Sequence, residues 1–267
     1  MDKQEILKLL PGSCPWHDSL LWFDSIDSTN THAKLLAAAG APEGTVLIAD
    51  CQTGGRGSRG RSFLSPAGNG IYLSVILRPD CRPQEIMHLT CAVGSAMCDA
   101  VERVCRIRPG VKWANDLVLG GRKIAGILTE LAVLPNGKID YLVIGIGINC
   151  CQSQSDFPEE IRSFAGSLFS VTGIPVDRNK LAAAMVFALW EMNGVLLRNK
   201  SSILKRYRSD CITLGRQISL VRADGIVRHG TVIGLDDNAA LLVQLDDGSF
   251  EAVSSGEVSV RGLYGYL

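Results

Sequence analysis

The chain has 267 residues, enough for one large domain or for one domain with a small module beside it. Its 27 basic and 27 acidic residues balance, whereas a dedicated duplex-DNA binder usually carries a net basic face. No stretch approaches the ~18 consecutive apolar residues of a membrane span, and residues 1–20 lack the apolar core of a signal peptide. We therefore expect a cytoplasmic protein with no membrane or nucleic-acid partner.

The nine cysteines are predicted to pack in the core rather than to bind metal. The sequence has no C-x-x-C and no Cys/His pair at zinc spacing. An odd number of cysteines in a reducing compartment argues against a disulfide framework. Cys91, Cys98 and Cys105 recur every seven residues, so on a helix they share one face and act as small hydrophobic residues.

Helices and strands are predicted to alternate through most of the chain. Segments rich in β-branched or aromatic residues predict strands at residues 20–23, 45–49 and 71–77. Helical periodicity and end signals predict helices over residues 4–10, 28–40, 83–104 and 177–198. Asp27 or Ser28 is expected to cap the second of these helices, and Asp177 the last.

The loop at residues 51–61, CQTGGRGSRGR, lies between two predicted strands. Residues 54–61 hold four glycines and three arginines. Such a chain has little steric restriction and carries charged forks that bind phosphate or carboxylate, so it can wrap an anion. Without a ligand it should be mobile, because it buries almost nothing apolar. A solvated arginine-rich loop with no ligand fits the same residues.

Two nucleotide-binding motifs match the residue types of this loop but not its structural context. Gly55, Gly57 and Gly60 spell G-x-G-x-x-G, and the same segment differs by one residue type from a P-loop. Both motifs require a helix directly after the loop to receive phosphate at its N-terminus. Residues 62–70 contain a proline and two glycines and lead into a strand, which excludes both motifs.

Two β-hairpins are predicted between residues 111 and 150. The first turns at Gly120–Gly121 and the second at residues 135–137. The polar residues within the first hairpin would also be expected in a sheet with one solvent-exposed face. The strand at residues 141–150 is almost entirely apolar, so we place it at the centre of the sheet. Two of its glycines leave one face bare for a group that packs against the backbone.

From Cys211 onward, short strands and tight turns replace the long elements. The strands are predicted at residues 216–221, 226–235, 240–245 and 249–253. This pattern is typical of a small antiparallel barrel after an α+β domain. We place the boundary so that residues 1–213 form the first domain and residues 214–267 the second.

Five motifs stand in order along the chain, before a terminal barrel that contains GEVSVRG. They are STN at 28–30, QTGGRGSRGR at 52–61, KWANDL at 112–117, GRKIAGILTE at 121–130 and GIGIN at 145–149. Together they resemble the biotin protein ligases over residues 20–262. The short N-terminal segment resembles the form of the family without a DNA-binding domain. The resemblance implies a mixed β-sheet flanked by helices, like that of class II synthetases, followed by an SH3-like barrel.

The resemblance also implies a reaction in two halves. The biotin carboxylate attacks the α-phosphate of ATP to give biotinyl-adenylate, and a lysine of a biotin carboxyl carrier protein then takes the biotin and releases AMP. No enzyme nucleophile is needed, in keeping with the lack of a nucleophilic triad pattern. Two anions must meet, so positioned cations and Mg²⁺ are expected. Relatives of this kind would also allow a homodimer.

Each matching residue receives a role from the resemblance. The catalytic groups would be Arg56, Lys123 and Asp116, and Asp116 would also be the candidate magnesium ligand. Biotin would be bound by Ser28, Thr29, Asn30, Gln52, Gly55, Arg56, Gly57, Ser58, Trp113, Lys123 and Gly126, with Gly145 and Gly147 shaping its slot. ATP would be bound by Arg59, Arg61, Phe63, Lys112, Asn115 and Asn149.

The loop departs from the family pattern at Ser58, where many members carry arginine. We expect weaker retention of biotinyl-adenylate as a result. The nearest alternative function is a lipoate or octanoate ligase, which would need a long apolar tunnel. A noncatalytic biotin-binding module and a DNA-binding regulator are further alternatives. The glycine-arginine loop and the barrel argue against a lipoate or octanoate ligase. Lys123, Asp116 and Arg56 argue against a noncatalytic module, and the balanced charge and short N-terminal segment argue against a DNA-binding regulator.

Overall fold

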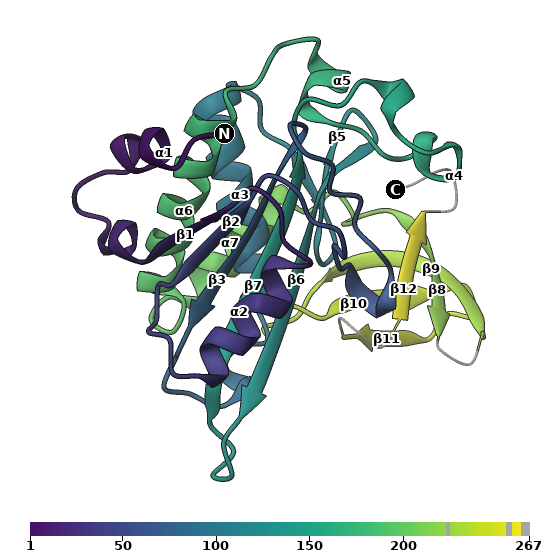
Figure 1. Ribbon diagram of the computed structural model, residues 1–267. Helices are drawn as coiled ribbons and strands as arrows, with labels where there is room; N and C mark the ends of the chain where they lie inside the picture. The colour runs from purple at the N-terminus through teal and green to yellow at the C-terminus, as the bar shows by residue number, and fades with distance from the viewer. Residues whose placement is uncertain (223–224, 255–257, 263–267) are drawn as a thin grey trace.

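The larger of two sheets carries the predicted α+β domain (Figure 1). The computed structural model describes residues 1–222, 225–254 and 258–262, the last of these as backbone only. The larger sheet has seven strands in the order β1-β2-β3-β7-β6-β5-β4. The first two strands pair in parallel and the other neighbours are antiparallel, which confirms a mixed sheet. The strands are β1 Leu20–Phe23, β2 Val46–Ala49, β3 Gly70–Leu77, β4 Gly110–Lys112, β5 Asp116–Leu119, β6 Arg122–Val133 and β7 Ile139–Asn149.

Strand β7 lies at the centre of this sheet, as its apolar composition predicted. It pairs with β3 on one side and β6 on the other. Successive side chains of a strand point to opposite faces. Ile144, Ile146 and Ile148 are therefore buried in the main core on one face, while Gly145 and Gly147 leave the other face without side chains.

Helices cover the two faces of the sheet unequally (Figure 1). On the Ile144 face, α3 Leu89–Cys105 packs against α6 Arg178–Val195 and α7 Lys200–Asp210, and the main core lies beneath them. On the opposite face, α2 Thr29–Ala38 packs on β3 and β7 over a small apolar cluster that includes Ala33 and Val143. Because α2 is short, part of this face remains available for a site.

Three shorter helices complete the larger domain. They are α1 Lys3–Leu9, which packs on α6, and α4 Glu159–Arg162 and α5 Leu168–Thr172, which follow β7. The predicted caps of the longer helices are present. The Ser28 side chain accepts a hydrogen bond at the start of α2, and the Asp177 side chain does so at the start of α6.

Two predicted elements are each split in the structure. The helix expected over residues 83–104 is a 3-10 turn at Pro83–Ile86 followed by α3, which begins only at Leu89. The strand expected before Gly120 is broken into β4 and β5. At both breaks, a group of the interrupting residue contacts a distant segment of the chain. The His88 ring lies 3.1 Å from the Leu196 carbonyl oxygen, and the Asn115 carbonyl accepts from the Ile127 N–H at 2.9 Å.

The predicted cysteine face of α3 is confirmed. Cys91 and Cys98 are buried in the main core, and Cys105 packs against it half-buried. Burial raises the pKa of the Cys91 thiol to about 12, so it remains protonated and unreactive at neutral pH. These residues act as small apolar side chains.

The second sheet is antiparallel, with the order β11-β10-β9-β8-β12, and is consistent with an SH3-like fold. Its strands are β8 Gln217–Arg222, β9 Val227–Leu235, β10 Leu241–Leu245, β11 Phe250–Val253 and β12 Val258–Gly262. Asp224, which lies between the first two predicted strands of this module, and the motif residues Gly256 and Glu257 are outside the described residues. The boundary between residues 213 and 214 stays a prediction.

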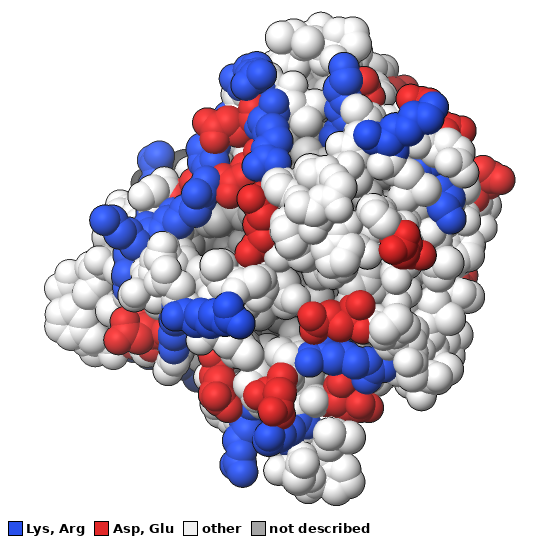
Figure 2. Space-filling model, turned by 90° about the vertical axis from the view of Figure 1, so that its left-hand side faces the viewer, with Lys and Arg blue, Asp and Glu red and all other residues white. Residues whose placement is uncertain are grey.

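Charged side chains of both signs are interspersed over the face drawn in Figure 2. This pattern agrees with the balanced charge of the sequence. Among the helices of the described residues, none combines the length and apolarity that crossing a bilayer requires.

Candidate active site

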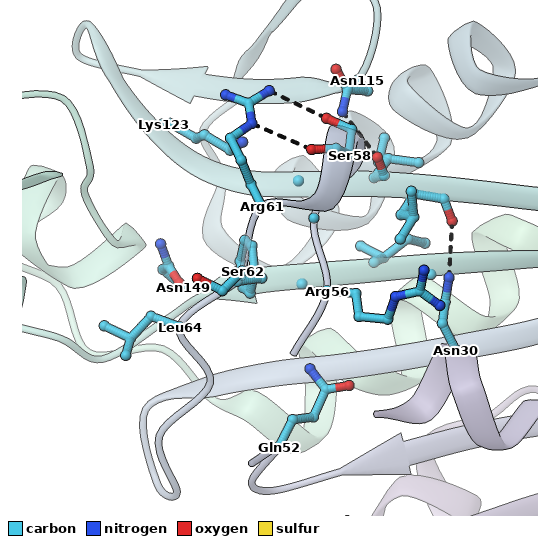
Figure 3. A pocket seen from close by; sticks show the side chains of 18 of the residues that line it. Asn30, Gln52, Arg56, Ser58, Arg61, Ser62, Leu64, Asn115, Lys123 and Asn149 are labelled. Carbon is cyan, nitrogen blue, oxygen red and sulfur yellow. Dashed lines mark hydrogen bonds between the residues drawn. The ribbon is translucent and has the colours of Figure 1, made fainter. Parts of the chain in front are cut away.

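A cavity of about 200 Å³ opens on the α2 face of the larger sheet. Its lining comes from segments far apart in the chain: the start of α2, the glycine-arginine loop, the β5–β6 hairpin, β7 and the turns after it (Figure 3). The predicted site residues that line it are Ser28, Thr29, Asn30, Gln52, Arg56, Gly57, Ser58, Arg61, Phe63, Asn115, Lys123, Gly126, Gly145, Gly147 and Asn149. Four of the five motifs therefore contribute at least two side chains or glycines each to one space.

Glycines form the floor of the cavity. A methyl group at Gly145 would overlap the Asn30 side chain, and one at Gly147 would overlap the Phe63 ring. The prediction that other groups pack against the bare face of β7 is confirmed, and Asn30 and Phe63 are those groups. Only glycine permits so close an approach of side chains to a strand.

The start of α2 is tied to the beginning of the loop through Gln52. The Gln52 Oε1 atom accepts hydrogen bonds from the Thr29 N–H at 2.9 Å and from the Thr29 hydroxyl at 3.0 Å. The Gln52 Nε2 atom donates to Ser65 Oγ at 2.9 Å. The Ser28 hydroxyl accepts from the Thr31 N–H at 3.4 Å. A polar, uncharged ligand group at this end meets donors and acceptors whose directions are already set.

The glycine-arginine loop folds back on itself beside the cavity. The Gly57 N–H donates to the Arg61 carbonyl at 2.6 Å, and the Phe63 N–H donates to the Gly55 carbonyl at 2.9 Å. A methyl group at Gly55 would collide with backbone, which explains a glycine there. Arg59 has a φ of 60°, in the left-handed region that favours glycine.

The three loop arginines are exposed and do not act alike. Arg56 and Arg61 line the cavity, whereas Arg59 lies outside the lining. The Arg61 guanidinium donates to the carbonyl and the hydroxyl of Ser58 at 3.3 and 3.4 Å (Figure 3). Arg56 Nη1 lies 3.4 Å from Glu130 Oε1. Two cations thus stand at the cavity on the exposed loop.

A bulge in β6 directs Lys123 toward the cavity. The pairing of β5 with β6 shifts register between Leu117 and Val118, so both Ile124 and Ala125 are buried in the main core. A bulge reverses which face the following side chains occupy. The Lys123 ammonium therefore lies over Gly126, 2.7 Å from Asp116 Oδ1. This ammonium is held by the sheet, unlike the arginines of the loop.

Two amide side chains lie at the far end of the cavity from α2. Asn115 Nδ2 donates to the Ile127 carbonyl at 3.0 Å. Asn149 is buried, its Nδ2 donates to the Gly166 carbonyl at 3.0 Å, and its Oδ1 accepts from Gln152 at 3.3 Å. Both amides are therefore fixed in orientation before any ligand arrives.

Five predicted site residues lie outside the lining of this cavity: Gly55, Arg59, Lys112, Trp113 and Asp116. Asp116 is adjacent through its contact with Lys123. The Trp113 indole N–H instead donates to the Ala239 carbonyl of the second sheet at 2.9 Å. Contact of Trp113 with biotin stays a prediction that the cavity lining does not support.

Sequence reasoning missed part of the wall. Phe157, Ile161 and Phe164 supply apolar lining from turns that follow β7. These turns reach the cavity because the Lys123 N–H donates to the Phe164 carbonyl at 2.8 Å. Nothing in the sequence of this segment marks it as part of a site. Glu130, which contacts Asn30 and Arg56, stood inside a recognised motif and was also missed.

The fold and this cavity define a ligase domain followed by a small all-β module, and comparison with known proteins agrees. The model of the biotin/lipoate A/B protein ligase family matches residues 22–149. The model of the biotin protein ligase C terminal domain matches residues 213–261.

The individual relatives are named as ligases. The bifunctional ligase/repressor BirA of Bacillus spizizenii is 34% identical over 230 residues, covering 86% of this chain and 70% of its own. The biotin--[acetyl-CoA-carboxylase] ligase of Mycobacterium tuberculosis is 34% identical over 237 residues, covering 86% and 85%. The structure of the Aquifex aeolicus biotin protein ligase with biotin and ATP matches with a TM-score of 0.76 at 30% identity, covering 91% of this chain and 99% of that one. The chain belongs to the biotin protein ligases.

Proposed function

We propose that this chain activates biotin with ATP and transfers it to a lysine of a biotin carboxyl carrier protein. The observation that carries the proposal is that the Lys123 ammonium, on the sheet, and the Arg56 and Arg61 guanidinium groups, on the loop, line one glycine-floored cavity. A carboxylate and a polyphosphate repel each other, and cations placed between them lower that barrier.

In the first half-reaction, a biotin carboxylate oxygen attacks the α-phosphate of ATP and pyrophosphate leaves. Lys123 and Arg56 hold the carboxylate and the α-phosphate oxygens near each other, and Arg61 draws the phosphates to the loop. Closure of the loop over the cavity would keep water from the mixed anhydride. Holding both reactants in line supplies much of the rate.

Biotin occupies the α2 end of the cavity. The ureido ring needs both donors and acceptors, and the Ser28, Thr29, Asn30 and Gln52 side chains provide them. Gly126, Gly145 and Gly147 make room for the flat ring and the tail against β6 and β7. Gly57 and Ser58 close over the ligand.

ATP occupies the other end, between Phe63, Asn115 and Asn149. Lys112 and Arg59 support its phosphates from outside the present lining. Among the described residues no cluster of three metal-ligating side chains exists. The Asp116 carboxylate would hold Mg²⁺ together with phosphate oxygens of the nucleotide, as is common for this ion in nucleotide sites. The ion would neutralise phosphate charge.

In the second half-reaction, the acceptor lysine attacks the acyl carbon and AMP leaves. A lysine must lose a proton to become a nucleophile, and Asp116 orients it beside Lys123. A carrier protein domain is the partner that presents such a lysine. A homodimer and a cytoplasmic location stay predictions.

The test is transfer of labelled biotin in the presence of Mg·ATP to a biotin carrier domain. We expect label on the carrier and none on a carrier whose acceptor lysine is replaced by arginine. Matched reactions with lipoate or octanoate should give no product. Label that stays unattached with active carrier would refute the proposal.

A further inference from the structure

Glu130 lies on β6, on the same face as the cavity and two residues beyond the lining residue Leu128. Its carboxylate is largely buried, with 21% of the side chain exposed. A buried carboxylate is unfavourable unless it is paired and hydrogen-bonded. None of the roles proposed above uses it, so its partners indicate what it does.

Both oxygens of Glu130 are occupied. Oε2 accepts a hydrogen bond from Asn30 Nδ2 at 3.0 Å. Oε1 lies 2.7 Å from Lys34 Nζ and 3.4 Å from Arg56 Nη1. Burial alone would favour the neutral acid, but the hydrogen bonds from Lys34 and Asn30 and the charge of Arg56 outweigh it and hold the pKa of Glu130 below its ordinary value. The group is therefore ionised at neutral pH.

The Asn30 contact joins Glu130 to a hydrogen-bond network at the biotin end of the cavity. With Nδ2 turned to Glu130, Asn30 Oδ1 accepts from the Ser74 hydroxyl at 2.6 Å. The Ser74 hydroxyl also donates to the Thr29 hydroxyl oxygen, 2.8 Å away, so Ser74 shares its single proton between Asn30 and Thr29 while the Thr29 proton goes to Gln52. Asn30 Nδ2 also donates to the Leu128 carbonyl at 3.4 Å, so without the carboxylate the amide would keep this longer hydrogen bond and lose the shorter one that holds its orientation.

The Arg56 contact ties the loop to the sheet. Of the ion pairs found among the described residues, this one alone involves an arginine of the loop at residues 51–61. Arg56 and Asn30 lie beside each other in Figure 3 because they share this carboxylate. Lys34 shares the same oxygen at a shorter distance. The Arg56 side chain is also half-exposed, so its ion pair with Glu130 is weak. An anionic ligand can therefore replace Glu130 as the partner of the guanidinium.

We propose that Glu130 is a positioning residue for biotin binding: one oxygen orients Asn30, and the other holds Arg56 at the cavity mouth until a ligand anion receives it. The inference rests on the proposed function. It assigns Glu130 no contact with substrate.

The test compares Glu130→Ala with wild type in two measurements. Calorimetry with biotin alone should show affinity about ten- to a hundredfold weaker, the loss typical of hydrogen bonds to a charged group. In adenylate formation, the KM for biotin should rise equally while the KM for ATP changes less than about threefold. Trypsin should cleave the loop faster, because Arg56 is no longer held. A variant that keeps wild-type biotin affinity would overturn the proposal.

Two controls separate positioning from a structural role. Lys34→Ala leaves Asn30 and Arg56 in place, so its biotin affinity should stay within about threefold of wild type. The exchange Lys34→Glu/Glu130→Lys keeps an ion pair between α2 and β6 but presents an ammonium to Asn30 and Arg56, so biotin affinity should remain low. If the double variant bound biotin with wild-type affinity, the proposal would be overturned. Failure of the wild type to transfer biotin would refute the proposed function, while the calorimetric comparison would still decide the role of Glu130.

Discussion

Lys123 owes its position to one bulge. Its motif predicted a place in the site, yet strict alternation in β6 would turn it to the same face as Ala125, toward the core. The bulge at Ile124 reverses this and sets the ammonium over Gly126. Arg56 reaches the same cavity from a loop. One cation is thus rigid and the other adaptable.

Removing either cation should cost the first half-reaction heavily. Loss of one well-placed group that stabilises developing charge costs about 3–4 kcal/mol. We expect Lys123→Ala and Arg56→Ala each to slow adenylate formation by about 100- to 1000-fold. Pyrophosphate exchange measures this step alone, and circular dichroism checks the fold. Near-normal exchange in both variants would contradict these roles.

Ser58 offers a second test of the charges on the loop. Its carbonyl and hydroxyl accept from Arg61, and its short side chain adds no charge to the loop. Ser58→Arg adds a cation over the adenylate, so we expect slower release of biotinyl-adenylate than from wild type. Rapid filtration after a single turnover without carrier measures the release. Ser58→Gln, which is long and neutral, should release it at the wild-type rate.

Strand β7 combines a core face and a binding face in alternate residues. Its isoleucines anchor the sheet, and its glycines let Asn30 and Phe63 lie against the backbone. The strand serves both purposes because a side chain placed at either glycine would collide with Asn30 or Phe63, which line the cavity. We expect the two faces to respond differently to substitution.

Gly145→Ala tests this division. The new methyl group displaces Asn30, so biotin affinity should fall about tenfold, the order of loss expected when one hydrogen bond to a ligand is removed. Gly194→Ala in α6 is the matched control, because nothing lies within 4 Å of the added methyl group. Calorimetry with biotin should show no change there. If both variants lost biotin affinity equally, the loss would come from a general effect on folding and not from a change in the binding slot.

The start of α3 carries a pH-dependent contact. Burial lowers the pKa of His88, and nearby Lys200 acts in the same direction, although the contact with the Leu196 carbonyl opposes them. The unfolded chain therefore binds a proton more readily than the folded one. The free energy of unfolding should be unaffected above about pH 6.5 and should fall as the pH drops below it.

Urea unfolding at several pH values measures this fall. His88→Gln can still donate to Leu196 but cannot ionise, so its free energy of unfolding should depend less on pH between about 7 and 5. Parallel pH dependence in the two proteins would show that other groups are responsible.

The whole molecule depends on how the second sheet meets the first. Cys211 forms a parallel bridge with Val111, the Trp113 N–H donates to Thr213 Oγ1 at 2.9 Å, and the Trp113 indole donates to the Ala239 carbonyl. The turn between β4 and β5 thus serves both sheets. A motif that borders the site is in this way coupled to the C-terminal module.

Trp113→Phe should destabilise the protein. It leaves the Ala239 carbonyl without its donor in a buried position, at a cost of about 1–3 kcal/mol. Urea unfolding measures the difference. Trp22→Phe is the control, since its indole donates to Asp24 at the surface and its loss should cost under about 1 kcal/mol. Equal costs would contradict a special role for the contact between the sheets.

Much of this protein could be predicted before its structure. The mixed sheet, the central place of β7, the cysteine face of α3 and the cap at Ser28 follow from local patterns, because burial and capping act on neighbouring residues. The motifs identified the family and most cavity residues. Local patterns also misplaced two boundaries, at α3 and at β4, where a carbonyl or side chain is used by a distant segment.

The sequence by itself determined which residue types were available: glycines that admit a ligand, cations that neutralise it, and strands and helices to carry them. Only the tertiary structure decided that Phe157, Ile161 and Phe164 form a wall, that a bulge turns Lys123 inward, and that Glu130 joins Asn30 to Arg56. Contacts between residues far apart in the chain depend on strand register and packing, and these leave no local trace in the order of amino acids.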